Sequence, residues 1–181
     1  MATAQEQLQS QSWHCVTCGM AHSGMFDLTA RFPYVWDGPD DCEPNGALRT
    51  DGNFLSEDFC VIGGEHFFVR SRFIIPVHGF EEPIGFGVWS TLSRRNFDVY
   101  VGAFDDGDYA DWGPWTGYFS NQLDVFGDTL NQPCWVQPRP DRCRPLLALD
   151  DEAHPLAAAQ KHGITADRVL EICASYGHVP A

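Results

Sequence analysis

The feature that most constrains this chain is Cys15-Val-Thr-Cys18-Gly19, with His22 four residues after the second cysteine. Two thiolates at this spacing form half of a tetrahedral zinc site. The adjacent glycine allows a sharp turn that points both sulfurs to one side, and His22 offers a local third ligand. The motif predicts a structural zinc knuckle over residues 13–25.

The fourth ligand does not follow from local spacing. Cys60 begins a predicted strand and is the first candidate, ahead of Cys42 in an acidic loop. Against it, a cysteine between Phe59 and Val61 is often only a small buried hydrophobic residue. The predicted cofactor is one structural zinc ion. Its predicted ligands are Cys15, Cys18, His22 and Cys60.

Two other uses of the motif stay open. Three protein ligands with a water in the fourth position would make an open zinc site of the kind that hydrolases use. No His-Glu-x-x-His motif occurs in the chain, and we assign no catalytic residue. A Cys-x-x-Cys pair also forms redox dithiols, which usually open a helix. Here Gly19, Ser23 and Gly24 follow the second cysteine and disfavour a helix.

Composition limits the partners that this chain can have. Its 181 residues are 44% hydrophobic, which is enough for one compact domain and short for two. The formal net charge of −14 repels nucleic acid and anionic membranes. We therefore expect no nucleic-acid or membrane partner. A protein partner with a basic surface would suit the charge.

The N-terminus and the cysteines predict a cytoplasmic location. Residues 1–12 are rich in Gln and Ser, contain no signal-peptide pattern and are expected to form a disordered tail. No apolar stretch approaches the roughly 20 residues that span a bilayer. Seven cysteines are an odd number, which argues against a disulfide framework.

Hydrophobic patterning predicts a single α+β domain over residues 13–177. Two apolar runs, 59–62 and 67–75, flank Gly63-Gly64 and predict a β-hairpin. Further strands are expected at 84–91, 115–123, 134–137 and 146–149, and helices at 94–104, 155–162 and 166–176. Most strands precede the last helices, so we expect an antiparallel sheet with C-terminal helices.

Two further segments offer surfaces for recognition. The acidic and aromatic stretch 105–119 is the predicted recognition surface, with core packing around the sheet as the alternative. Arg139, Arg142 and Arg144 lie among prolines. These arginines can hold an anion or an acidic loop of the same molecule, or they can be solvated.

Several short motifs occur in an order that resembles a known family. They are Cys15-x-x-Cys18-Gly19-x-x-His22, Asp58-Phe59-Cys60, Phe67-Phe68-Val69-Arg70, Trp89-Ser90-Thr91, Asp128-Thr129-Leu130, Arg144-Pro145-Leu146 and His154-Pro155-Leu156-Ala157. From Trp13 to Cys173 this order is similar to the bacterial domain-of-unknown-function family numbered 2199. The resemblance implies a bacterial, cytosolic, single-domain protein and no particular activity. The resemblance also implies that the four predicted ligands lie at positions that match the family's motifs. The stretch 37–53 departs from the family pattern.

We therefore expect a zinc-stabilised protein that is not an enzyme and that binds a protein partner in a regulatory or immunity-like role. The alternatives are a metal-dependent hydrolase with an open zinc site and a Cys-x-x-Cys redox protein. Metal content and the number of protein ligands separate these alternatives.

Overall fold

The computed structural model describes residues 3–9, 13–22, 25–107, 109 and 111–179. Parts of three predicted segments therefore lie outside the described residues. They are residues 1–2 and 10–12 of the expected tail, Ser23 and Gly24 of the expected knuckle, and Asp108 and Ala110 of the acidic stretch.

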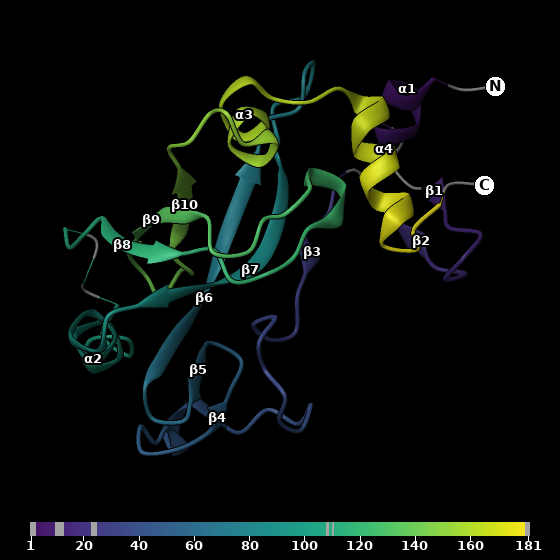
Figure 1. The fold of residues 1–181 in the computed structure, drawn as a ribbon. Helices are drawn as coiled ribbons and strands as arrows, with labels where there is room; N and C mark the ends of the chain where they lie inside the picture. Colours follow the sequence, from purple (N-terminus) through teal and green to yellow (C-terminus); the bar gives the residue numbers. More distant parts are fainter. Residues whose placement is uncertain (1–2, 10–12, 23–24, 108, 110, 180–181) are drawn as a thin grey trace.

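Strands and helices are arranged as an α+β fold, as the sequence predicts (Figure 1). In chain order the elements are α1 (Ala4–Gln9), β1 (Trp13–His14), β2 (Ala21–His22), β3 (Leu28–Thr29), the 3₁₀ turn η1 (Asn45–Ala47), β4 (Phe54–Leu55), β5 (Phe59–Ile62), β6 (His66–Ile75), β7 (Ile84–Leu92), α2 (Arg94–Gly102), β8 (Trp115–Tyr118), the 3₁₀ turn η2 (Asp124–Phe126), β9 (Pro133–Gln137), β10 (Leu146–Leu149), α3 (Pro155–His162) and α4 (Ala166–Ser175).

The antiparallel pair β6 and β7 forms the centre of the fold. Its register runs from Phe67 opposite Leu92 to Ile75 opposite Ile84. The predicted hairpin between β5 and β6 is confirmed, and both residues of its Gly63-Gly64 turn have positive φ. Glycine adopts this left-handed conformation without the steric penalty that a Cβ would bring.

The main sheet is mixed, which corrects the antiparallel sheet expected from the sequence. Its strand order is β3-β7-β6-β10-β9-β8. β10 runs parallel to β6, with Leu146 opposite Arg72, and β3 runs parallel to β7. Parallel neighbours need long crossover connections, so they pair segments far apart in the chain that no local pattern connects.

The sheet curls so that β8 returns to β7. Phe119 pairs with Ser90 in an isolated bridge, and the Tyr118 N–H donates to Thr91 Oγ1 at 2.9 Å. Gly117 permits this close approach, because a Cβ at that position would lie 2.3 Å from the Thr91 carbonyl oxygen. The curl helps to enclose the main hydrophobic core.

Side chains pack against both faces of the β6–β7 pair. The main core contains the fully buried Phe73 and the buried faces of α3 and α4. A smaller core on the other face contains Leu55, Cys60, Phe68 and Trp89. It is covered by apolar side chains of residues 30–36.

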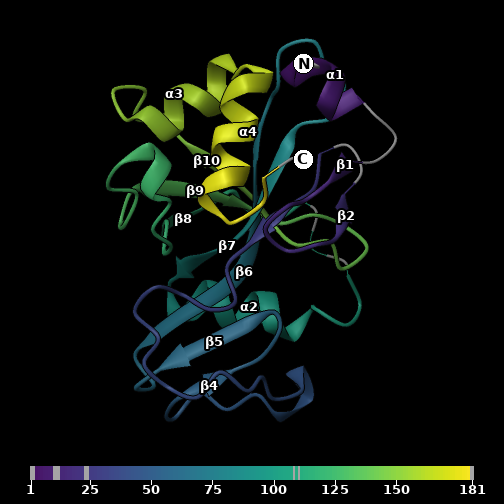
Figure 2. The same ribbon diagram turned by 90° about the vertical axis from the view of Figure 1, so that its right-hand side faces the viewer.

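The N-terminal and C-terminal segments meet at one end of the molecule (Figures 1 and 2). Helix α1 packs against α4, and Leu8 of α1 is buried in the main core. Residues 4–9 of the expected disordered tail are therefore helical. Two apolar residues, Ala4 and Leu8, are too few to identify a helix from the sequence, and burial against α4 supplies the missing stabilisation.

Among the described residues, none of the helices is both long enough and apolar enough to cross a membrane.

Candidate metal centre

The cysteine motif lies on a tight turn between two short strands. β1 pairs with β2, which places His14 opposite Ala21. The Cys15 N–H donates to the Met20 carbonyl at 2.9 Å, and the Gly19 N–H donates to the Cys15 carbonyl at 3.0 Å. Gly19 has a φ of 70°. The turn therefore depends on glycine at the position where the sequence places it.

The end of the chain folds against this turn. Gly177, with a φ of 80°, ends the helical segment and redirects the backbone. The following His178 N–H donates to the Cys173 carbonyl at 2.8 Å. The Val16 N–H donates to the Val179 carbonyl at 2.9 Å. Residues more than 160 positions apart in the chain are thus held side by side (Figure 2).

Four potential metal ligands come together where the two ends meet. One ligand atom each from Cys15, Cys18, His22 and His178 lies within 4.8 Å of the other three. Cys18 Sγ lies 3.3 Å from His22 Nε2. Cys15 is fully buried, Cys18 is exposed, and both histidines are half-buried. This group of side chains can hold a metal ion.

Backbone amides surround the buried sulfur of Cys15. The N–H groups of Cys18 and Val179 point to Cys15 Sγ at 3.4 Å and 3.3 Å. Burial raises the pKa of Cys15, but hydrogen bonds from Cys18, Thr17 and Val179 outweigh it and lower this pKa to about 6. Such donors stabilise a thiolate, which is the form of cysteine that binds metals.

The two histidines are held by a phenylalanine and by each other. The Phe26 ring stacks on His22 with centroids 4.7 Å apart, and the His178 ring meets His22 edge-on at 4.8 Å. The Nδ1 atom of His178 is buried and has no hydrogen-bond partner among the described residues. Such a nitrogen requires a partner that this part of the chain does not supply.

The structure brings together three of the four residues proposed from the sequence. Cys15, Cys18 and His22 lie in the group, whereas Cys60 lies in β5 and packs in the smaller core. Burial raises the pKa of Cys60 to about 12, which disfavours its thiolate. The fourth member of the group is His178.

His178 was missed because its position depends on the fold. In the sequence it is a histidine that follows a helix-ending glycine. It lies too far along the chain from the cysteines to form a recognisable metal-binding motif with them. The pairing of Val16 with Val179 and the contact of the Val179 N–H with Cys15 Sγ bring it to the turn. A search for histidines near either terminus would have found it, but without a reason to prefer it.

Residues 14–164 match a family model described as "Uncharacterized protein conserved in bacteria (DUF2199)". The chain belongs to this family. The resemblance inferred from the short motifs is thereby confirmed. The match includes Cys15, Cys18 and His22 of the DUF2199 chain and ends before His178. Neither the curated proteins nor the solved structures gave a match to the chain.

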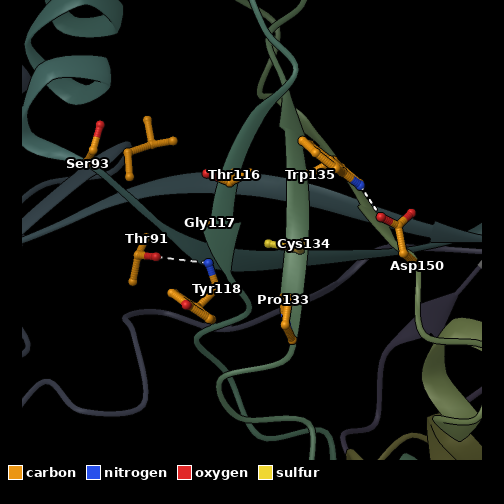
Figure 3. Close-up of a pocket in the computed structure, with 10 residues that line it drawn as sticks. Thr91, Ser93, Thr116, Gly117, Tyr118, Pro133, Cys134, Trp135 and Asp150 are labelled. Carbon is orange, nitrogen blue, oxygen red and sulfur yellow. Dashed lines mark hydrogen bonds between the residues drawn. The ribbon is translucent and has the colours of Figure 1, made fainter.

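A second feature of this DUF2199 protein is a surface groove of about 500 Å³ beside β8 and β9 (Figure 3). Tyr118, Pro133 and Trp135 line it, and the Trp135 indole N–H donates to the Asp150 carboxylate. Tyr118 is 53% exposed and Trp135 is 38% exposed. Neither metal-centre cysteine lines the groove.

The predicted aromatic surface is divided between this groove and the core. Trp112 is 39% exposed, and Tyr118 lines the groove. Phe119 is fully buried and packs edge-on against Phe73 at 5.6 Å. The stretch 105–119 therefore contains exposed aromatic side chains as well as aromatic side chains that pack in the core.

Proposed function

We propose that Cys15, Cys18, His22 and His178 bind one structural zinc ion, and that the protein is a non-enzymatic module that acts by binding a protein partner. The observation that carries the metal site is the convergence of four ligand atoms from both ends of the chain within 4.8 Å. The buried, unpartnered Nδ1 of His178 supports it independently.

Zinc fits this donor set better than other common metals. Two thiolates and two imidazoles are a standard tetrahedral set for structural zinc, whereas magnesium and calcium prefer oxygen ligands. Ligand atoms around tetrahedral zinc lie about 3.3–3.8 Å apart. The Cys18–His22 distance of 3.3 Å already fits, and the widest separation of 4.8 Å needs a contraction of about 1 Å.

Four protein ligands favour a structural role. A catalytic zinc ion needs an open position for water, and here His178 is available to close the shell. The ion would join the β1–β2 turn to the segment after α4, so metal binding would fasten the two termini together. The alternative of a hydrolase with an open zinc site requires that His178 does not coordinate.

The redox alternative uses the same cysteines without a metal. The lowered pKa of Cys15 is a property that redox dithiols share with metal-binding cysteines. The residues between Cys15 and Met20 form a turn rather than the start of a helix, which disfavours the usual redox arrangement. A dithiol would cycle through a Cys15–Cys18 disulfide in metal-free protein.

Zinc content of protein purified without added metal tests the metal site. We expect about one zinc ion per chain by mass spectrometry, loss of zinc in His178→Ala and in Cys15→Ser/Cys18→Ser, and retention in Cys60→Ala. Cys42→Ser is the matched control, because Cys42 is exposed and lies outside the group. Retention of zinc in His178→Ala together with loss in Cys60→Ala would restore the original ligand set.

Three outcomes distinguish the alternatives for this site. Full zinc content in His178→Ala, with a metal-bound water, would favour the hydrolase. Absence of metal together with a reversible Cys15–Cys18 disulfide would favour the redox protein. Our proposal expects that His178→Ala loses zinc and that both termini then become more mobile.

The partner surface that we propose is the groove of Tyr118, Pro133 and Trp135. Exposed aromatic side chains beside polar groups are enriched at protein interfaces. With Asp150 at its edge and a net charge of −14 on the chain, this surface suits a basic partner. An immunity-like or regulatory role would use such an acidic, aromatic face.

In-cell cross-linking followed by mass spectrometry tests this surface. We expect the wild type to be cross-linked reproducibly to one basic protein, and Tyr118→Ala/Trp135→Ala to recover at least tenfold less of that protein. Aromatic hot-spot residues each contribute about 2 kcal/mol or more to the free energy of binding. Tyr34→Ala is the control, because Tyr34 is also exposed, at 61%, but does not line the groove. Equal capture by both variants would exclude the groove as the interface.

A further inference from the structure

Four arginines line one surface cavity of this acidic protein. Arg72 of β6 and Arg139, Arg142 and Arg144 of the loop after β9 surround a space of about 540 Å³. The whole chain has only 11 basic Lys and Arg residues, so this is a marked local concentration of positive charge. Phe104 and Asp58 complete part of the lining.

Two of these arginines are already held by carboxylates. Arg72 makes a bidentate pair with Asp27 at 2.8 Å and 3.0 Å. Arg144 contacts Glu57 at 2.7 Å and Asp58 at 3.2 Å. These ion pairs fix the two guanidinium groups in the wall of the cavity and neutralise most of their charge.

The other two arginines retain donors for a ligand. Arg139 donates through Nε to the Arg144 carbonyl at 2.8 Å, and within the described chain no carboxylate forms an ion pair with it. The ion pair that Arg142 forms within the described residues is a 3.5 Å contact with Asp105, whose side chain is 95% exposed. An exposed pair of this kind contributes little, so a ligand can displace Asp105.

The backbone and an aromatic ring set the position of Arg142. The Arg142 guanidinium lies over the Phe104 ring, 5.4 Å from its centroid. Asp141 and Arg142 have φ values of 58° and 59°, and the Cys143 N–H donates to the Pro140 carbonyl at 3.1 Å. Arginine rarely adopts this left-handed turn conformation, and such residues are concentrated at functional sites.

A buried hydroxyl near the cavity has no hydrogen-bond partner among the residues that the structure describes. Tyr109 is only 1% exposed, and its Oη forms no hydrogen bond of good geometry within the described residues. Its ring packs against Tyr100 with centroids 4.8 Å apart, and its hydroxyl interacts electrostatically with three residues that line the cavity, Asp58, Arg142 and Cys143. A ligand oxygen would accept the hydrogen bond that the protein does not supply.

We propose that this cavity binds the phosphate group of a small molecule, with Arg139 and Arg142 as its main ligands and the Tyr109 hydroxyl as a further donor. Two guanidinium groups without strong partners match the two charges of a phosphate monoester. The space exceeds one phosphate and lies within the range of small-molecule sites. The net charge of the chain disfavours a polyanionic nucleic acid as the ligand. This site goes beyond the proposed zinc and partner-binding roles and depends on neither.

Calorimetric titration with inorganic phosphate at constant ionic strength tests the site. We expect one saturable site, at least tenfold weaker binding in Arg139→Gln and in Arg142→Gln, and about threefold weaker binding in Tyr109→Phe. Arg31→Gln is the matched control, because Arg31 also makes an exposed 3.5 Å pair, with Asp40, but lies outside the cavity. Circular dichroism and thermal unfolding establish that each variant is folded.

Four results would overturn the proposal. They are no saturable binding by the wild type, equal weakening in Arg31→Gln, acetate binding as tightly as phosphate, or a single-stranded oligonucleotide binding more tightly than phosphate. A repeat in the presence of a chelator keeps the two proposals separate, since phosphate binding should be unchanged when the metal is removed.

Discussion

The β6–β7 pair and the joined termini are held together by different forces. β6 and β7 are paired along a long antiparallel ladder of backbone hydrogen bonds. Side chains of both strands, such as Phe73 and Trp89, are fully buried. At the termini the contacts are short segments of backbone pairing around four candidate ligand side chains, of which Cys15 is buried and the other three are half-buried or exposed. The sheet is therefore stabilised by burial, whereas the terminal junction depends on the geometry of a few polar groups.

This difference predicts two levels of stability within one chain. Regions with many buried apolar contacts open only when the whole protein unfolds, while regions with few open locally. A metal ion at the junction of the termini would raise the free energy of local opening there towards that of the sheet. The following experiments separate the two regions, beginning with the largest expected effect.

Phe73→Ala should cause the largest loss of stability. Phe73 is fully buried and contacts Phe119, so its removal leaves a cavity in the main core. We expect the free energy of unfolding to fall by about 3–5 kcal/mol. Urea denaturation followed by tryptophan fluorescence measures it, and the loss should be the same with and without chelator. Ile74→Ala, at a partly exposed position of the same strand, is the control and should lose markedly less.

Metal removal should affect the junction and spare the sheet. With free zinc at a hundred times its dissociation constant, binding stabilises the closed junction by about 2.7 kcal/mol. Hydrogen exchange should therefore accelerate at residues 13–22 and 176–179 after chelation, while the amides of β6 and β7 keep their protection. Equal acceleration in both regions would mean that zinc stabilises the whole fold, and unchanged exchange would argue against the metal.

The sheet could be predicted from the sequence to a large extent because its signals are local. The Gly63-Gly64 turn, the apolar run 67–75 and the caps Ser93 and Thr165 each act on their immediate neighbours. The expected strands and helices are therefore found within a few residues of their predicted bounds. The strand expected at 115–123 ends at Tyr118, where the chain turns back to bridge β7.

The features that were missed depend on contacts between distant segments. The parallel pairing of β10 with β6 joins Leu146 to Arg72, and no spacing in the sequence records it. The same is true of Leu8, whose burial accompanies the packing of α1 on α4, and of His178. Local motifs identified one side of the candidate metal centre, whereas its other side is a property of the tertiary structure.

Gly117→Ala tests the curl of the sheet and should have an intermediate effect. A Cβ there would lie 2.3 Å from the Thr91 carbonyl, so β8 must move away from β7. We expect a loss of about 1–3 kcal/mol in thermal or urea unfolding. Gly102→Ala is the control, because a Cβ at Gly102 meets nothing within 4 Å. Zinc affinity should be unchanged in both variants, since the curl and the junction are separate.

The smallest effect, and the sharpest test of the comparison, comes from two matched helix caps. Thr165 Oγ1 accepts from the Arg168 N–H at 3.3 Å at the start of α4, and Ser93 Oγ accepts from the Asn96 N–H at 3.2 Å at the start of α2. Replacing either residue with alanine should cost about 1 kcal/mol of stability. The two variants should differ in their effect on the metal, because α4 positions His178 and α2 lies at the other end of the molecule (Figure 1).

Zinc affinity measured by competition with a chromogenic chelator distinguishes the caps. We expect Thr165→Ala to weaken zinc binding by up to about fivefold, which corresponds to the 1 kcal/mol that fraying of α4 adds to closing the site. Ser93→Ala should leave it unchanged. If both variants bind zinc like the wild type, α4 and the segment after it move independently. The contacts of residues 178 and 179 with the β1–β2 turn would then have to hold His178 in place. If both weaken it equally, the junction and the sheet form one cooperative unit, and the separation into two levels of stability would be wrong.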